Sequence, residues 1–204
     1  MHTECLKYML ICQIGLIAWF PFKLKGQSAL QRFDDKVLID LSEKRTPEKT
    51  DFFLFLSNHN DWVNVGVPAG LLAGGIIADD KRMRQNALYV ASSSAVNVLL
   101  TMLIKKIVKR PRPFLANVKI KAVYQPSHYS FPSGHTSTSF TTATALSQAY
   151  PKWYVIVPSY LWAGSVGYSR LYLGVHYPTD VAAGAVLGAG AAFSLRGMGT
   201  PKPE

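Results

Sequence analysis

Six apolar segments, separated by polar or charged joints, dominate the sequence. They cover residues 8–22, 62–78, 87–104, 136–150, 153–168 and 179–195. Most are about 15 to 18 residues long, slightly shorter than the ~20 residues that a helix needs to span a bilayer. No run of alternating polar and apolar residues indicates a strand. The sequence therefore predicts an all-α, membrane-embedded bundle of about six helices, formed by one domain over residues 1–204.

The composition shows why these segments are only moderately apolar. Apolar residues make up 49% of the chain and charged residues 17%, yet the mean hydropathy is only +0.10. The segments are rich in Gly, Ala, Ser and Thr, which let helices pack closely within a membrane and which also lower a hydropathy sum. Charge is too scarce for a disordered chain, and two cysteines are too few for a disulfide scaffold.

The first apolar segment, residues 8–22, has two interpretations. It has a basic flank at Lys7 and a polar exit over residues 23–28, as a signal peptide does, but no obvious small-x-small cleavage site follows it. Residues 1–27 are therefore expected to form either a first spanning helix or a signal peptide.

The chain is basic, with 22 Lys and Arg against 12 Asp and Glu and a net charge of +10. Such an excess suits nucleic acid, an anionic membrane surface or a phosphorylated substrate. Many of the cations lie at residues 105–112, directly after a strongly apolar segment. Nucleic acid is a poor fit to that setting, and we expect no nucleic-acid partner.

The first of three polar motifs is this basic stretch, KKIVKRPRP at residues 105–113. Basic residues at a helix end can simply satisfy the terminal carbonyl groups. They can also clamp an anion, because a forked guanidinium group engages two phosphate oxygens at once. The prolines on both sides of Arg112 would stiffen such a clamp.

The second motif, FPSGHT at residues 131–136, opens the fourth apolar segment. Ser133 is expected to be the N-cap of a helix, and Gly134 permits a tight turn. The free N–H groups at a helix start can bind an anion. His135 would lie in the first turn, where it can pass a proton.

The third motif lies between the last two segments, at residues 169–180. If Pro178 starts the last helix, Asp180 lies in its first turn, close to His176. A carboxylate on one ring nitrogen fixes the tautomer of a histidine and leaves the other nitrogen free to attack. Arg170 adds a second guanidinium group. A helix-capping aspartate and a surface histidine are the simpler alternative.

Counted from an inside amino terminus, all three motifs fall on the same outer face of the membrane. Seven Lys and Arg would then lie inside and 15 outside, against the positive-inside rule, so this orientation rests on the site alone. Residues 23–61 and 105–133 are expected to be long loops. His59 and Asp61 are expected to cap the second helix, with substrate contact as the alternative.

Together the three motifs resemble those of the type 2 phosphatidic acid phosphatases, the PAP2 superfamily. The family pattern is Lys-x6-Arg-Pro, then Pro-Ser-Gly-His, then Ser-Arg-x5-His-x3-Asp. All eleven fixed positions occur here in order, namely Lys105, Arg112, Pro113, Pro132, Ser133, Gly134, His135, Ser169, Arg170, His176 and Asp180. The motif-bearing core spans residues 87–195.

The resemblance implies a role for each residue. Lys105, Arg112 and Arg170 would bind the phosphate oxygens, together with Ser133 and the N–H group of Gly134. His176 would attack phosphorus and form a phosphohistidine, with Asp180 orienting it. His135 would protonate the leaving alkoxide and then help to activate water. The resemblance implies neither a metal nor another cofactor.

The resemblance thus predicts a phosphatase of the inner membrane that hydrolyses a lipid phosphate or diphosphate on the outer, periplasmic side. A periplasmic or secreted acid phosphatase with a cleaved leader is the alternative. A vanadate-dependent haloperoxidase and a catalytically silent phosphate- or lipid-binding membrane protein are the remaining possibilities.

Overall fold

The computed structural model describes residues 27–199, and the segment at residues 8–22 lies outside this range. The described part consists of helices and connections, with no strand. The helices are α2 (Gln27–Glu43), α3 (Pro47–Ile77), α4 (Lys81–Val108), α5 (Pro113–Ala116), α6 (Gly134–Ala149), α7 (Trp153–Tyr172) and α8 (Pro178–Ser194), followed by the 3-10 turn η1 (Arg196–Met198). The all-α prediction is confirmed.

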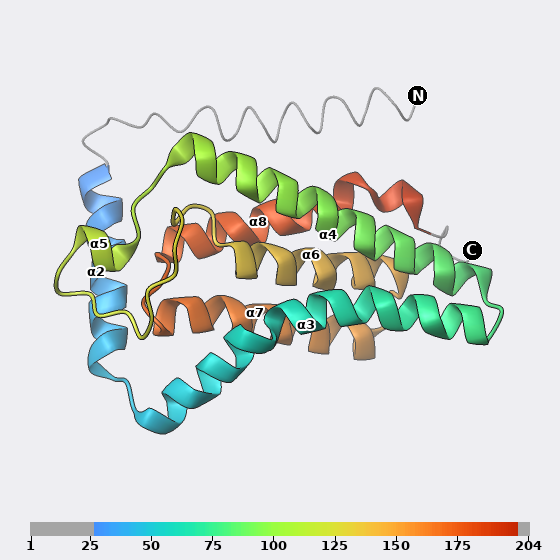
Figure 1. Cartoon of the computed structure of the whole chain (residues 1–204), viewed down its shortest axis with the longest axis horizontal. Coiled ribbons are helices and arrows are strands. Elements are labelled where there is room, and N and C mark those ends of the chain that lie inside the picture. Colours follow the sequence, from blue (N-terminus) through green and yellow to red (C-terminus); the bar gives the residue numbers. More distant parts are fainter. Residues whose placement is uncertain (1–26, 200–204) are drawn as a thin grey trace.

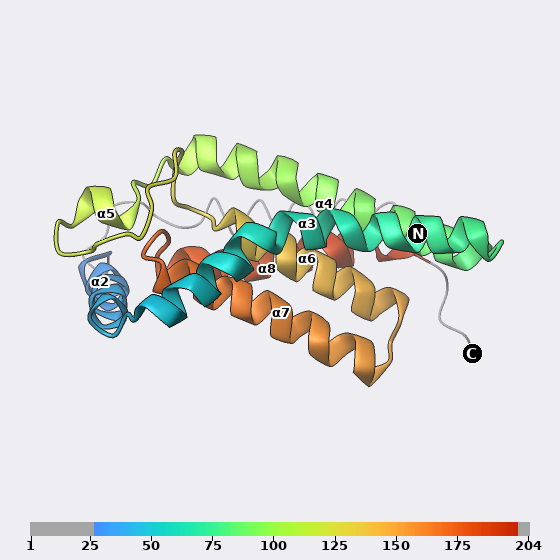
Figure 2. The same cartoon turned by 60° about the horizontal axis from the view of Figure 1, so that its bottom comes forward.

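Five long helices, α3, α4, α6, α7 and α8, run side by side as an elongated bundle (Figure 1). Helix α2 lies across one end of this bundle, and α5 and the long connection before α6 lie at the same end. The second view shows the same arrangement, with the α3–α4 turn at the opposite end (Figure 2). The connections at the α2 end contain the three polar motifs.

Capping residues and a proline define the ends of these helices. Thr46 caps α3, accepting a hydrogen bond from the Lys49 N–H at 3.3 Å, and Pro47 follows at the first helical position, where its missing N–H has no cost. The Asp80 side chain caps α4. Helix α4 ends at Lys109, which has the left-handed conformation common at helix ends (φ 51°).

The structure corrects the prediction of a loop over residues 23–61. Its described part contains α2 and the first half of α3. Helix α2 includes the amphipathic residues 30–41, and α3 begins upstream of the predicted second segment and contains a run of phenylalanines and leucines, residues 52–56. His59 and Asp61 therefore lie inside a helix and do not cap one; the His59 ring contacts the Phe55 carbonyl instead.

Small glycine-containing surfaces bring α6 and α8 close together. A Cβ atom on Gly188 would lie 2.1 Å from the carbonyl oxygen of Ser137, and one on Gly184 would lie 2.7 Å from that of Ser133. Neither distance allows a side chain, so both positions require glycine. This four-residue spacing is the small-xxx-small pattern of packed membrane helices.

The bundle has a polar interior and an apolar surface. Buried side chains between α3, α4 and α6 form hydrogen bonds across the helices, including Asn60, Asn64, Asn97, Ser137, Ser139 and Thr142. Large apolar side chains on α3 and α4 point outward, including Trp62 (77% exposed), Ile77 (87%), Leu99 (61%) and Ile107 (76%), as does Val186 (75%) on α8. In water such a surface would be costly, whereas a lipid bilayer solvates it.

Residues 27–199 contain one stretch, Lys81–Ala116, that is by itself long and apolar enough to cross a membrane. It includes α4. The other long helices carry the Ser, Thr, Asn and Gly residues that face the interior, and these lower their hydropathy without reducing the apolar character of their outer faces.

Candidate active site

The structure brings the three motifs together at the α2 end of the bundle. The first begins in the last turn of α4 and continues beyond it, the second opens α6, and the third runs from the last turn of α7 into the first turn of α8 (Figure 1). Backbone hydrogen bonds join them: the Ser133 N–H donates to the Asp180 carbonyl at 3.0 Å, and the Ser130 N–H donates to the Arg110 carbonyl at 2.8 Å. The predicted shared face is therefore present in the fold.

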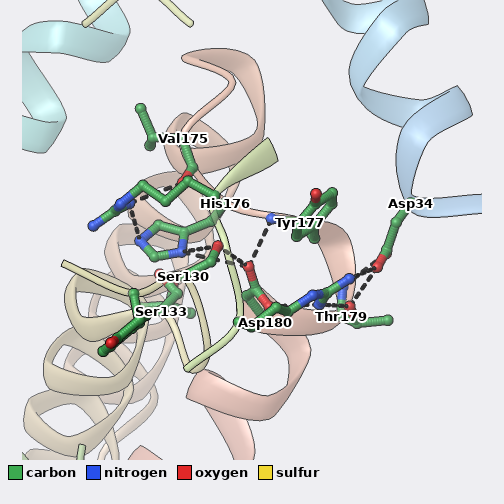
Figure 3. A network of polar contacts seen from close by, with 12 residues as sticks. Asp34, Ser130, Ser133, Val175, His176, Tyr177, Thr179 and Asp180 are labelled. Carbon is green, nitrogen blue, oxygen red and sulfur yellow. Dashed lines mark hydrogen bonds and ion pairs between the residues drawn. The ribbon is translucent and has the colours of Figure 1, made fainter. Parts of the chain in front are cut away.

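His176 and Asp180 face each other at the start of α8. Pro178 occupies the first turn of that helix, which places Asp180 one turn after His176. The Nδ1 atom of His176 lies 3.6 Å from Oδ2 of Asp180. The N–H group of Tyr177 also donates to this oxygen, at 3.0 Å, so the carboxylate caps the helix and orients the imidazole at once (Figure 3).

Arg112 contacts the other side of the imidazole. Its Nη1 lies 3.2 Å from Nε2 of His176 and 2.9 Å from the Val175 carbonyl. The remaining guanidinium nitrogens donate to the carbonyls of Ser127 and His128, each at 3.0 Å. Because a guanidinium group has no acceptor, Nε2 accepts this hydrogen bond and carries no proton.

Lys105 and Arg170 border the same region. The Lys105 ammonium group donates to the carbonyls of Tyr129 (2.6 Å) and Ser130 (3.4 Å). Arg170 is 2% exposed and donates to the hydroxyl groups of Tyr124 and Ser57, the former at 2.7 Å. Its Nε is buried and has no hydrogen-bond partner within residues 27–199, and a buried donor of this kind is costly unless a ligand engages it.

The second motif begins α6 as predicted. Ser133 is the N-cap, but its hydroxyl lies 2.8 Å from that of Thr136 and does not cap a backbone N–H. The first-turn amides, starting with Gly134, are therefore not used by a side-chain cap. His135 follows in the same turn; within residues 27–199 its ring makes no hydrogen bond to the other predicted site side chains.

Comparison with known proteins identifies the family. A family model described as the PAP2 superfamily matches residues 86–200, which is more than half of the chain. The chain belongs to the PAP2 superfamily. It is accordingly a phosphatase and an integral membrane protein.

Two relatives of this chain are named for a phosphatase activity on a polyprenyl lipid. An undecaprenyl-diphosphatase of Sulfolobus acidocaldarius is 30% identical over 188 residues, which cover 91% of this chain and 88% of the relative. A decaprenylphosphoryl-5-phosphoribose phosphatase of Mycobacterium tuberculosis is 36% identical over 110 residues, 53% of this chain and 58% of the relative. The similarity to the first protein therefore extends over nearly the whole length of both chains.

Two solved PAP2 structures share the fold. A transmembrane phosphatidylglycerolphosphate phosphatase from Bacillus subtilis superposes with a TM-score of 0.71 at 23% identity, covering 94% of both chains. LpxE of Aquifex aeolicus has a TM-score of 0.66 at 27% identity, covering 80% of this chain and 95% of that one. The membrane-embedded helical bundle is thereby confirmed.

Charge in this PAP2 site depends strongly on burial. Burial lowers the pKa of His176 to about 3, with smaller contributions from Arg170 and Arg112, although Asp180 opposes the shift. Burial and the neighbouring Arg170 lower the pKa of Arg112 to about 10. At neutral pH the site thus holds a neutral imidazole next to a charged guanidinium group.

The PAP2 motifs do not include every residue in contact with this centre. The Ser130 hydroxyl donates to Oδ2 of Asp180 at 2.5 Å and lies 3.4 Å from Nδ1 of His176. Arg110 forms an ion pair with Oδ1 of Asp180 at 2.6 Å. In the sequence Arg110 is only one cation of a cluster, and Ser130 has no distinguishing signal beyond its place two residues before Pro132.

Proposed function

We propose that this chain hydrolyses a lipid phosphate or diphosphate through a phosphohistidine formed on His176. The observation that carries the proposal is the state of the imidazole. Nδ1 faces Asp180 at 3.6 Å, whereas Nε2 accepts a hydrogen bond from Arg112. An imidazole held in this way has its lone pair on the nitrogen that faces the cationic groups, which is the arrangement that a nucleophile requires.

In the first step, Nε2 of His176 attacks phosphorus. A nitrogen–phosphorus bond forms while the bond from phosphorus to the leaving oxygen breaks, and the imidazole becomes a cation that Asp180 stabilises. His135 donates a proton to the leaving oxygen. Arg112 exchanges its contact with Nε2 for a phosphate oxygen, and this movement releases the lone pair.

In the second step, water attacks the phosphohistidine. His135, now neutral, accepts the proton from water, the nitrogen–phosphorus bond breaks, and phosphate leaves with His176 restored. Lys105, Arg112 and Arg170 would face the equatorial oxygens, where charge accumulates during phosphoryl transfer. Support comes from the unpaired Nε of Arg170 and the uncapped first turn of α6.

A lipid is the best-supported substrate class. The apolar outer faces of the helices place the site at the end of a membrane-embedded bundle, where a headgroup can reach it while its chain stays in the bilayer. The long match to a protein named undecaprenyl-diphosphatase makes a polyprenyl diphosphate the first candidate. We further propose that the site faces the outer side of the membrane.

The test is phosphate release by purified protein in detergent micelles. A polyprenyl diphosphate, phosphatidate and phosphatidylglycerol phosphate are compared with a water-soluble phosphate monoester, for the native chain and for His176→Ala. We expect release from at least one lipid, faster than from the soluble ester, and none by the variant. Equal activity of the folded variant would contradict the mechanism, and activity on the soluble ester alone would contradict the lipid substrate.

A further inference from the structure

We propose that Asp34 of α2 and Arg110 after α4 are positioning residues for Asp180, and that α2 thereby contributes to the active site. This inference rests on the proposed function, because Asp180 matters only if His176 is the nucleophile. Asp34 lies outside the three motifs, and Arg110 lies within the first one but is not among the fixed positions of the family pattern. Figure 3 shows the chain of contacts that runs from His176 through Asp180 to Asp34.

Each oxygen of Asp180 has its own set of partners. Oδ2 faces His176 and accepts from the Ser130 hydroxyl at 2.5 Å and from the Tyr177 N–H at 3.0 Å. Oδ1 accepts from Nη1 of Arg110 at 2.6 Å. Asp180 is fully buried, and within residues 27–199 Arg110 is the permanent cation in direct contact with it.

Arg110 is itself held between two carboxylates. Its Nη2 donates to Oδ2 of Asp34 at 2.8 Å and to Gln31 at 3.0 Å, while Nη1 also donates to the Thr179 hydroxyl at 2.7 Å. Its guanidinium carbon lies 3.9 Å from the centre of the Tyr177 ring. Although burial opposes it, Asp180 and Asp34 raise the pKa of Arg110 above its usual value, so the bridge stays charged.

Asp34 fixes this bridge to the start of α8. It is fully buried and accepts hydrogen bonds from the Thr179 N–H at 3.1 Å and from the Thr179 hydroxyl at 2.5 Å. Thr179 directly precedes Asp180. One side chain from α2 therefore anchors both Arg110 and the helix turn from which Asp180 projects.

The charge of Arg110 matters for function because Asp180 must stay ionised to stabilise the imidazole cation of His176. A buried carboxylate without a cation becomes protonated, and a neutral Asp180 no longer stabilises a charged imidazole. The charged or titratable groups that face Asp180 from neighbouring elements are His176, Tyr177, Arg110, Arg112, Lys105 and Asp34. Among them the contact with His176 and the cation of Arg110 keep Asp180 ionised against its burial, and Asp34 adds a like charge but holds Arg110 in place.

Variants at the two positions are therefore expected to differ in their pH profiles. Arg110→Ala should raise the pKa of Asp180, so that kcat/KM falls on acidification at a higher pH than in the native chain, with kcat lower by about tenfold or more, the loss of one charge-assisted hydrogen bond. Asp34→Asn should lower kcat by several-fold, with KM unchanged and no such shift of the pH profile. The variant Arg110→Lys should regain little of the kcat that Arg110→Ala loses, because an ammonium group lacks the forked geometry that reaches both carboxylates.

The double variant Asp34→Asn/Arg110→Ala sharpens the test. Removal of the like charge should move the acid limb to lower pH than in Arg110→Ala alone, and should recover a fraction of the lost stability. Guanidinium ion in millimolar concentrations should raise the activity of Arg110→Ala and leave the native chain unaffected. If Arg110→Ala does not fold, the double variant and Asp34→Asn still report on the bridge.

Asp40→Asn is the matched control. Asp40 is an exposed carboxylate on the same helix, and within residues 27–199 it makes no side-chain contact with Arg110, Thr179 or Asp180, so this variant should keep the native kcat and pH profile. A native kcat and a native pH profile in both folded Arg110→Ala and Asp34→Asn would overturn the inference. A native chain that releases no phosphate, or an active His176→Ala variant, would instead contradict the proposed function.

Discussion

A serine outside the three motifs completes the contact between the two central residues. Because the His176–Asp180 separation is 3.6 Å, the Ser130 hydroxyl, within 2.5 Å of Asp180 and 3.4 Å of His176, helps to hold both groups. Ser130→Ala should therefore lower kcat by about tenfold, the loss of one charge-assisted hydrogen bond, and leave KM unchanged.

Steady-state kinetics on the lipid substrate measure this effect. Ser127→Ala is the control, because Ser127 contributes only its backbone carbonyl to the Arg112 contacts. An unchanged kcat in Ser130→Ala would show that Asp180 orients His176 without this hydroxyl.

The protonation state of His176 predicts the acid side of the pH profile. Because burial lowers its pKa to about 3, acidification through the ordinary histidine pKa of about 6.5 does not protonate it. We therefore expect kcat/KM of the native chain not to fall as the pH is lowered from 8 to 5, after correction for ionisation of the substrate phosphate, because His135, the general acid of the first step, only gains its proton over this range. An acid limb near pH 6.5 that survives this correction would mean that His176 titrates normally.

The site residues in the motifs could be predicted from the sequence because the chemistry of the site dictates their spacing. The four-residue separation of His176 and Asp180 predicted their contact across a helix start, and the structure shows it. The contact between Arg110 and Asp34 could not be predicted from the sequence in this way. They lie 76 positions apart in segments that pack together only after the bundle has formed.

At the scale of elements, α2 and α3 show where sequence patterns were misread. A threonine, a proline and a glutamate at residues 46–48 are a helix-start signal, and α3 begins there. The polar residues that follow, such as Ser57 and Asn60, suggested a loop but are buried, and Asn60 is hydrogen-bonded to Thr138 and Ser139 of α6. A polar residue inside a membrane bundle thus resembles a loop residue in sequence.

The close contact of α6 with α8 predicts a strong effect of one methyl group. Gly188→Ala would place its Cβ 2.1 Å from the Ser137 carbonyl oxygen, so the helices must separate. We expect a free energy of unfolding lower by about 3 kcal/mol, together with reduced activity, because the site is built at the ends of these helices.

Thermal unfolding in detergent measures the change. Gly164→Ala on α7 is the control, since nothing lies within 4 Å of its added Cβ. Equal melting temperatures for Gly188→Ala and the native chain would show that the α6–α8 contact is looser than described.

At the scale of the whole molecule, the fold explains both the modest hydropathy and the positive charge of the chain by where the residues lie. The modest mean hydropathy of +0.10 reflects polar side chains inside the bundle, while large apolar side chains cover its surface. Part of the positive charge, including Lys105, Arg110, Arg112 and Arg170, lies at the α2 end of the bundle, where a phosphate would bind. Average composition alone shows neither that many polar side chains are buried inside the bundle nor that the positive charge is concentrated at one end.

This distribution predicts how the protein behaves on extraction. Because its apolar faces require lipid, the chain should stay with membranes after washing at high pH in carbonate and should need detergent for release. Immunoblots of the pellet and supernatant measure the partition. Release of the folded chain into the carbonate supernatant would favour the soluble acid phosphatase.

The central claim is that His176 carries the phosphoryl group. The most direct measurement is an acid-free quench of the protein during turnover of a lipid diphosphate labelled in its terminal phosphate, followed by mass spectrometry of the peptides. We predict an acid-labile, alkali-stable phosphate on His176 that is absent from His176→Ala. Stable labelling of another residue, or turnover by His176→Ala at the native rate, would contradict the account.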